Sequence, residues 1–303
     1  MSIDYRVLGM PGADNALYVE VDSGQSVERL LFDCGESCVS AIPFAEILNL
    51  DHLCFSHFHM DHVCGFDSVF RALFDRDAKP NVVWGPPGTG RIMHHRFQGF
   101  LWNLHENLDV PWRVVDISGG ELHTQRFELK EAFATAHDEG RQPWSRTILE
   151  GTGFTLEAIL MDHHTPSVAY VVREKPKRNI DVSRLGALGL KPGPWMKALK
   201  EAASDGEEIV AGGVTYRAGE LRERLIVESP GDSIAYLTDF LLDAPALERL
   251  SAFLDGCRTL VCESQYRDAD LELAKRHGHM TAVLAATLAR SARAQALVLF
   301  HVS

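Results

Sequence analysis

The stretch Ser56-His57-Phe58-His59-Met60-Asp61-His62 decides how this chain is interpreted, because it places four acid–base side chains within six positions. It reads His-x-His-x-Asp-His and follows residues 50–55, whose apolar end at 53–55 predicts a short buried strand. Alternate residues of an extended segment project together, so His57 and His59 are predicted to hold one metal ion, while Asp61 and His62 turn toward a second. A chance cluster of histidines in a solvated loop is the competing interpretation, and the strand-then-loop context argues against it. Neutral imidazoles and carboxylates suit Zn²⁺ best, with Mn²⁺ and Fe²⁺ as the alternatives.

Three further candidate ligands stand alone in distant parts of the chain. His163, Asp239 and His301 each come directly after a run of apolar residues that predicts a strand. Loops at the ends of strands gather functional side chains, so we expect these three residues to join the first motif. Together they provide enough ligands for two divalent cations, with one carboxylate free to bridge.

Predicted strands and helices alternate along most of the chain. Strands are expected at 15–21, 29–33, 53–55, 81–84, 113–117, 154–161, 168–172, 234–238, 259–262 and 296–300. Helices are expected at 40–48, 66–74, 196–203 and 281–294. Residues 180–231 are less regular and contain several glycines, so we expect an inserted lobe within a single domain that spans residues 1–303.

The composition describes a globular protein with an acidic balance. Of the 303 residues, 46% are hydrophobic, which is ample for a large buried core. The formal net charge of −12 argues against a protein that coats nucleic acid nonspecifically, since phosphate binding needs lysine and arginine. The basic segment 173–179 is interpreted either as a solvated loop or as a phosphate contact. We find neither a targeting segment nor an apolar run that would cross a membrane, so a cytoplasmic location is expected.

Six cysteines are distributed along the chain. They show neither the Cys-x-x-Cys spacing of a structural zinc site nor the density of a disulfide framework. We therefore expect most of them to be small buried side chains, and we assign no role to Cys54 and Cys64, which flank the metal motif.

Motifs across nearly the whole chain resemble the metallo-β-lactamase superfamily and, within it, the RNase Z family of tRNA 3′-processing endonucleases. The His-x-His-x-Asp-His motif alone indicates only the superfamily. Pro166, Tyr170, the His-x-Thr at 279–281 and the His-x-Ser at 301–303 narrow the match. The matching segments are 31–36, 57–62, 163–170, 237–239, 278–282 and 297–303. The resemblance implies a four-layer αββα sandwich, in which two mixed β-sheets pack face to face with helices outside, and a homodimer.

The resemblance also implies how the ligands divide between two metal ions. The implied set is His57, His59 and His163 for one ion, Asp61, His62 and His301 for the other, and Asp239 as the bridge. His163 fits the family spacing to Pro166 and Tyr170, and His164 is the alternative ligand. Asp33 is expected to orient the metal-binding loop, with the capping of a turn as its alternative role.

Glu263 and His279 are similar to the family's proton-donating pair. The carboxylate would hold the imidazole so that it protonates the departing sugar oxygen, and Asp61 is the third residue expected to act in catalysis. His277 competes with His279 for this assignment, and a plain surface histidine is the simpler interpretation.

The implied function is a dinuclear hydrolase that cleaves the 3′ trailer from precursor tRNA with a hydroxide that bridges both metal ions. Two segments depart from the family pattern, because residues 8–12 replace its opening loop and residues 180–231 show no clear basic arm of the kind that grips tRNA. The acidic charge and the missing arm favour an alternative, a phosphodiesterase or an ester or lactone hydrolase of small molecules on the same scaffold. A metal-bound binding protein without turnover is a third hypothesis, disfavoured because every expected ligand can be placed.

Overall fold

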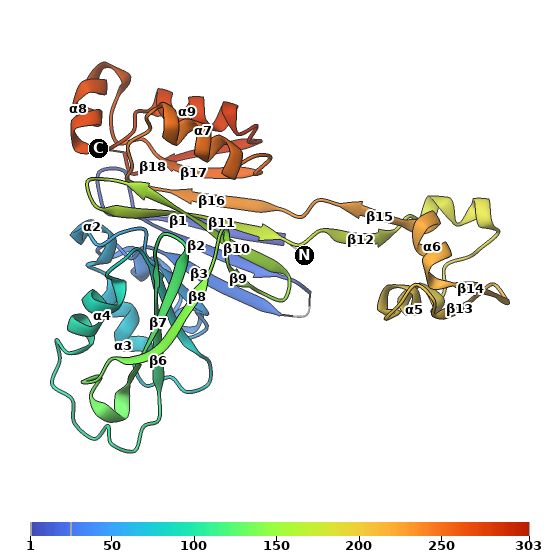
Figure 1. The fold of residues 1–303 in the computed structure, drawn as a ribbon, viewed down its shortest axis with the longest axis horizontal. Helices are drawn as coiled ribbons and strands as arrows, with labels where there is room; N and C mark the ends of the chain where they lie inside the picture. Colours follow the sequence, from blue (N-terminus) through green and yellow to red (C-terminus); the bar gives the residue numbers. More distant parts are fainter. Residues whose placement is uncertain (1, 25, 303) are drawn as a thin grey trace. The chain divides into compact units, whose positions relative to one another are not determined.

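The computed structural model describes residues 2–24 and 26–302 (Figure 1). Ser303, which ends the predicted His-x-Ser motif, lies outside the described residues. The described part of the chain divides into two compact units. The main unit contains residues up to Glu174 and from Asp232 onward, and the lobe contains Lys175–Gly231.

The first sheet of the main unit runs in sequence order from β1 to β8 within the described residues. Its strands are β1 (Ser2–Leu8), β2 (Ala16–Asp22), β3 (Val27–Phe32), β4 (His52–Cys54), β5 (Asn81–Gly85), β6 (Pro111–Ile117), β7 (Glu121–Glu128) and β8 (His137–Pro143). Strands β3 to β6 are parallel, while the outer pairs are antiparallel. The carboxyl ends of the parallel strands therefore meet at one edge.

The second sheet has the order β18-β17-β16-β11-β10-β9. Its strands are β9 (Thr147–Glu150), β10 (Phe154–Asp162), β11 (Pro166–Glu174), β16 (Ser233–Leu237), β17 (Thr259–Glu263) and β18 (Ala296–Phe300). Strands β16 to β18 are parallel, and the others pair antiparallel. Both sheets are mixed, as the sandwich prediction requires.

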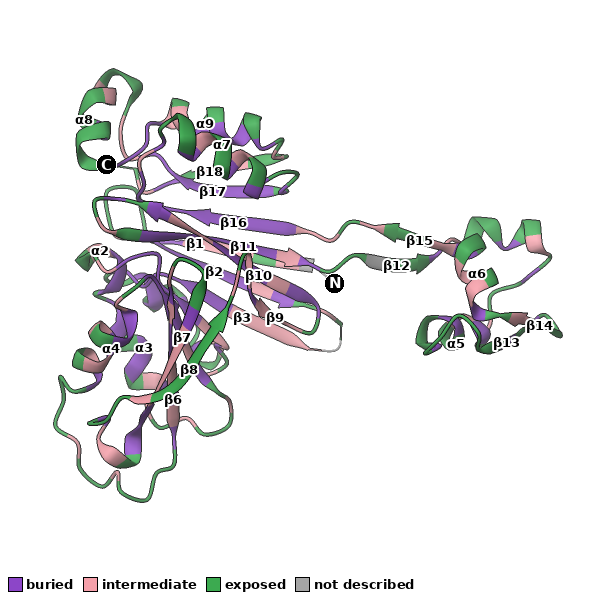
Figure 2. Cartoon of the chain, viewed as in Figure 1, coloured by how far each residue is buried: buried purple, intermediate pink, exposed green. Residues whose placement is uncertain are grey.

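Three hydrophobic cores separate four layers in the main unit. Phe32 of the first sheet packs against Tyr170 and Tyr236 of the second, which forms the core between the sheets. Strand β11 shows why both faces are buried: Val168, Tyr170 and Val172 face the first sheet, and the alternate residues face the outer helices. Figure 2 shows β16 and β17 buried along their length.

Helices cover the outer face of each sheet. The first sheet carries α1 (Phe44–Ile47), α2 (Met60–Val63), α3 (Phe66–Leu73) and α4 (Thr89–Phe97), and the second carries α7 (Ala244–Phe253) and α9 (Ala282–Ser291) (Figure 1). Helix α8 (Leu271–His277) lies beyond the ends of the strands (Figure 1). An aromatic cluster around Phe66, Phe70 and Phe97 fills the first helical layer. Burying each such ring stabilises the fold by about 1.5–3 kcal/mol. The predicted αββα sandwich is confirmed.

The helix predicted at 40–48 is wrong. A 3₁₀ turn at Cys38–Ala41 and the short helix α1 replace it. Pro43 interrupts the segment, because its ring pushes Ile42 into an extended conformation with ψ of 126° and removes a backbone donor. Strand β1, at the edge of its sheet, was not predicted from the sequence.

The lobe has a core of its own, centred on Leu199, Leu221 and Leu225. Its elements are β12 (Lys177–Ile180), α5 (Trp195–Glu201), β13 (Glu208–Ala211), β14 (Val214–Arg217), α6 (Ala218–Leu225) and β15 (Ile226–Ser229). Strands β13 and β14 form a hairpin whose two loop residues, Gly212 and Gly213, both have positive φ, the conformation that a tight hairpin turn requires. In the described ranges, no helix of either unit is long and apolar enough to cross a membrane.

Candidate metal centre

The His-x-His-x-Asp-His motif lies where β4 ends at the parallel edge of the first sheet. His57 and His59 are on the extended segment after the strand, with His57 buried and His59 exposed. Asp61 and His62 are on the single turn of α2. The His62 ring lies 4.2 Å from the His57 ring and 5.4 Å from the His301 ring, centroid to centroid, so it stands between the two candidate ligand groups.

Asp33 holds this motif in place from the neighbouring strand. Its Oδ1 accepts a hydrogen bond from the backbone N–H of Ser56 at 2.7 Å, and its Oδ2 accepts from Ser56 Oγ at 2.6 Å. The same Oδ2 accepts from His62 Nδ1 at 2.8 Å and from Tyr236 Oη at 2.9 Å. Because Nδ1 of His62 donates to Asp33, its Nε2 is left to face the centre. These contacts give Asp33 the orienting role that the sequence predicted.

The second sheet supplies the remaining candidates. His163 follows β10, Asp239 follows β16 and His301 follows β18. Asp239 and His301 both have a left-handed backbone, with φ of 48° and 51°. The backbone N–H of His301 donates to Asn15 Oδ1 at 3.1 Å, while Asn15 Nδ2 donates to the carbonyl of Leu8. Asn15 therefore supports His301 from the opposite end of the sequence.

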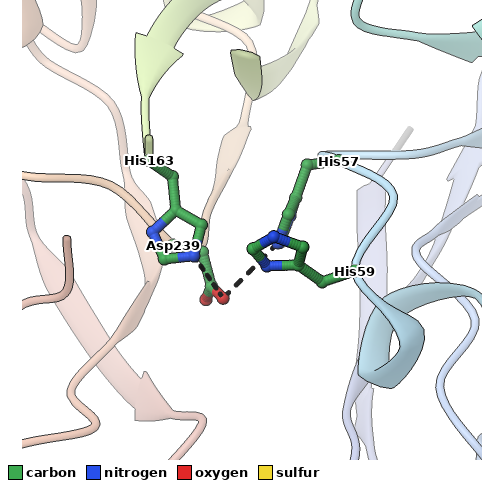
Figure 3. Close-up of side chains that lie close together, drawn as sticks. All are labelled: His57, His59, His163 and Asp239. Carbon is green, nitrogen blue, oxygen red and sulfur yellow. Dashed lines mark ion pairs between the residues drawn. The ribbon is translucent and has the colours of Figure 1, made fainter. Parts of the chain in front are cut away.

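Among the described residues, the predicted ligands form two groups that share Asp239. The groups are His57, His59, His163 and Asp239, and Asp61, His62, Asp239 and His301. Within each group the ligand atoms all lie within 4.8 Å of one another. Asp239 Oδ2 lies 3.6 Å from His57 Nε2 and 3.7 Å from His163 Nε2 (Figure 3). The same oxygen lies 3.2 Å from His62 Nε2. The fold thus brings together all seven residues predicted as ligands.

His57 provides one test of whether this cluster fits a cation. Burial, assisted by the neighbouring His62, lowers the pKa of His57 to about 2, so its imidazole is neutral. Ser56 Oγ lies 3.0 Å from its Nδ1, whereas its buried Nε2 has no hydrogen-bond partner among the described residues. A neutral imidazole with a buried, unpartnered nitrogen is a fitting ligand for a divalent metal ion.

The carboxylates provide a second test. Burial raises the pKa of Asp239, but nearby His62 and hydrogen bonding with His301 outweigh it and hold that pKa well below the usual value. For His301 burial acts in the opposite direction and lowers the pKa of the imidazole. Contacts with Asp239 and Asp61 outweigh burial and raise that pKa to about 10. The ionised carboxylates thus draw positive charge to the centre, which is the charge that divalent cations would bring.

Glu263 and His279 adjoin the same carboxylate. Glu263 is fully buried at the end of β17, and burial raises its pKa. Its Oε1 accepts from the backbone N–H of Phe240, and its Oε2 lies 3.1 Å from His279 Nδ1. His277, the competing histidine, instead has its Nδ1 2.6 Å from Tyr266 Oη. The expected carboxylate–imidazole pair is therefore Glu263 with His279.

Some residues of the centre escaped the sequence reasoning. Asn15 acts through His301 and Tyr236 through Asp33, while Ser56 contacts both Asp33 and the neighbouring His57. A polar residue opening a predicted strand was the one signal for Asn15. Cys54 is buried as expected, whereas Cys64 is exposed.

Comparisons with known proteins find relatives of this chain. Residues 14–165, half of the chain, match the family model described as anti-Pycsar protein Apyc1. The chain is 48% identical to ribonuclease Z of Deinococcus radiodurans over 297 residues, which cover 98% of this chain and 89% of that protein. It is 28% identical to ribonuclease Z of Methanocaldococcus jannaschii, with 91% and 77% covered.

Solved structures share the fold. Human tRNase Z, short form, superposes with a TM-score of 0.59 at 17% identity, covering 100% of this chain and 93% of that one. The metallo-β-lactamase fold protein YhfI from Bacillus subtilis gives a TM-score of 0.54 at 17% identity, with 99% and 86% covered. Both matches concern the architecture alone.

Proposed function

The chain belongs to the ribonuclease Z family of the metallo-β-lactamase superfamily, and we propose that it is a metal-dependent endoribonuclease that removes the 3′ trailer from precursor tRNA. One observation carries this proposal: two groups of metal-binding side chains share Asp239, and the Glu263–His279 pair adjoins the same carboxylate. This arrangement provides for attack on a phosphodiester and for protonation of its leaving group at one place.

The proposed ligands are those of the two groups. His57, His59 and His163 would hold one ion, Asp61, His62 and His301 the other, and Asp239 would bridge them. When bound, two divalent ions would activate water and neutralise the charge that develops on the phosphate. The mixture of neutral imidazoles and carboxylates supports Zn²⁺, with Mn²⁺ or Fe²⁺ as alternatives.

His279 would protonate the departing oxygen. In this proposal water loses a proton to solvent as it adds to phosphorus, the P–O3′ bond breaks, and the 3′ oxygen of the tRNA body takes a proton from His279, which solvent then reprotonates. Glu263 accepts a hydrogen bond from Nδ1 of His279 and so turns Nε2 of the ring outward, away from the carboxylate.

The lobe would provide the RNA contact. Residues 175–231 contain ten Lys and Arg against eight Asp and Glu, whereas the rest of the chain contains twenty against thirty-four. A formal charge of +2 on a chain of −12 makes the lobe the more favourable region for phosphate.

We propose that the lobe is an insertion in a single metallo-β-lactamase domain. We also propose that the protein acts as a homodimer in the cytoplasm.

The proposal is tested by incubating protein reconstituted with zinc or manganese with a precursor tRNA and with bis(4-nitrophenyl) phosphate. We expect a mature 3′ end, and loss of turnover together with loss of metal in His59→Ala. Because the main unit is strongly acidic, hydrolysis of a small phosphodiester is the second candidate function. If the protein cleaves the nitrophenyl diester but leaves precursor tRNA uncut, the first function is rejected in favour of the second.

A further inference from the structure

The tip of the β10–β11 hairpin caps the carboxyl end of helix α8. Asp162 pairs with Pro166 across the hairpin, and the loop between them contains His163 and His164. His163 Nδ1 donates to the carbonyl of Gly278 at 2.8 Å, and His164 Nε2 donates to the carbonyl of Arg276 at 3.1 Å. Both acceptors lie at the end of α8, where carbonyl groups lack partners within the helix.

The segment that these histidines hold leads directly to His279. The last turn of α8 closes through the backbone N–H of His279, which donates to the carbonyl of Ala274 at 2.9 Å. The His279 ring then lies 4.7 Å from the His163 ring, centroid to centroid, with its Nδ1 at Glu263. Small movements of this helix end would therefore move His279.

Gly278 packs closely against the side chains of His163 and His164. Gly278 has φ of 72°, and a Cβ at this position would lie 2.9 Å from His163 Nδ1 and 3.4 Å from the His164 ring. His164 itself has φ of 57°, a left-handed backbone that directs its side chain from the hairpin tip to the helix end. The hairpin and the helix end approach each other at a glycine, as close backbone packing requires.

We propose that His164 is a positioning residue, which caps α8 through the carbonyl of Arg276 and thereby fixes His279 against Glu263 and the metal centre. His163 is the candidate ligand, whereas His164 acts through the protein backbone alone. The inference rests on the proposed role of His279 as the group that protonates the leaving oxygen. It predicts that loss of the His164 side chain impairs the transfer of the proton rather than the binding of metal.

The test compares His164→Gly with the wild-type protein on substrates that differ in their leaving groups. Glycine accepts positive φ without strain, so this variant removes the side chain and spares the backbone. Nitrophenolate departs without a proton, whereas the sugar oxygen of a diribonucleoside monophosphate or of precursor tRNA needs one. We expect about a five- to tenfold lower kcat on the sugar leaving groups, the value of one hydrogen bond. Unchanged kcat on bis(4-nitrophenyl) phosphate and unchanged zinc content are expected alongside it.

Two further variants serve as controls. His94 also directs its Nε2 to a carbonyl at 3.1 Å, that of Ala134, so His94→Ala removes a similar contact from α4 and should leave both rates unchanged. His164→Gln keeps an N–H donor of similar reach and should recover part of the loss. An equal loss on both classes of substrate, or loss of zinc, would overturn the inference. If the wild type cleaves the dinucleotide and not precursor tRNA, the tRNA function fails, while the ratio of rates still decides the role of His164.

Discussion

The loop at 56–62 and the single ligands of the second sheet build the same centre by different means. The loop concentrates four candidate ligands in one stretch of chain, and Asp33 holds it through Ser56 and His62. His163, Asp239 and His301 each come from a separate strand. A short segment can preset its geometry through local backbone, whereas isolated ligands depend on contacts with distant residues. Three kinds of substitution test this contrast. They alter Asp239, which both ligand groups share, Asp33, which supports the loop at 56–62, or Asn15, which supports His301.

The largest effect is expected from Asp239→Asn, since Asp239 belongs to both ligand groups. An amide binds metal less well than a carboxylate, so both ions should be lost and kcat should fall about a thousandfold or more. Metal analysis of the purified protein and the diester assay measure both results. Asp61→Asn is the matched control, because it alters one group and should retain about one ion per chain. Two ions bound to Asp239→Asn would contradict the bridging assignment.

Asp33→Asn should weaken metal binding by the loop at 56–62, which Asp33 contacts through Ser56 and His62. The amide would meet the donors of Ser56, His62 and Tyr236 with one acceptor in place of two. Metal affinity should fall about 10- to 100-fold, as for other groups that orient a ligand. Competition with a chelator measures this change.

Asp51→Asn is the control for that variant. Its carboxylate also accepts from a backbone N–H, that of Arg29, and pairs with Lys79, remote from the predicted ligands. Metal affinity should stay at the wild-type value. An equal fall in both variants would mean that Asp33 has no special role.

Asn15→Ala should weaken metal binding by the single ligands of the second sheet, because Asn15 supports His301. It leaves the N–H of His301 and the carbonyl of Leu8 without their partner, which should lower the free energy of unfolding by about 1–3 kcal/mol. The group that contains His301 should lose metal first, and the group at His57 should retain it. Urea unfolding and metal titration provide the measurements. Exposed Asn49→Ala, which removes a bond to the carbonyl of Ala45, should change neither.

The smallest effect is expected from Tyr236→Phe, which removes one donor to Asp33. The free energy of unfolding should fall by about 1 kcal/mol, and metal affinity by a few-fold. Tyr170→Phe is a close match, since Tyr170 lies in the same core and donates to the carbonyl of Phe55 at 2.8 Å. It should destabilise the fold equally while leaving metal affinity unchanged. Identical metal affinities in the two variants would remove Tyr236 from the support of Asp33.

Many of the regular elements were predictable, because buried segments show as apolar runs in the sequence. Strands β10 and β11 are mostly apolar, which predicted their positions, whereas the αββα class followed from the resemblance of the motifs to the family. The failure at 40–48 has a local cause, because the apolar pattern continues across Pro43 while the backbone does not. Strand β1 was missed although it pairs with β2 along its whole length.

The sequence alone shows which residue types are available to bind metal and which segment is dense enough to begin the site. It does not show that Asn15 supports His301, or that His164 reaches the carbonyl of Arg276. Those choices belong to the tertiary structure. The physical reason is that a hydrogen bond or a shared ligand depends on distances of a few ångströms between groups that the chain separates by a hundred residues or more, and only the packed sheets set those distances.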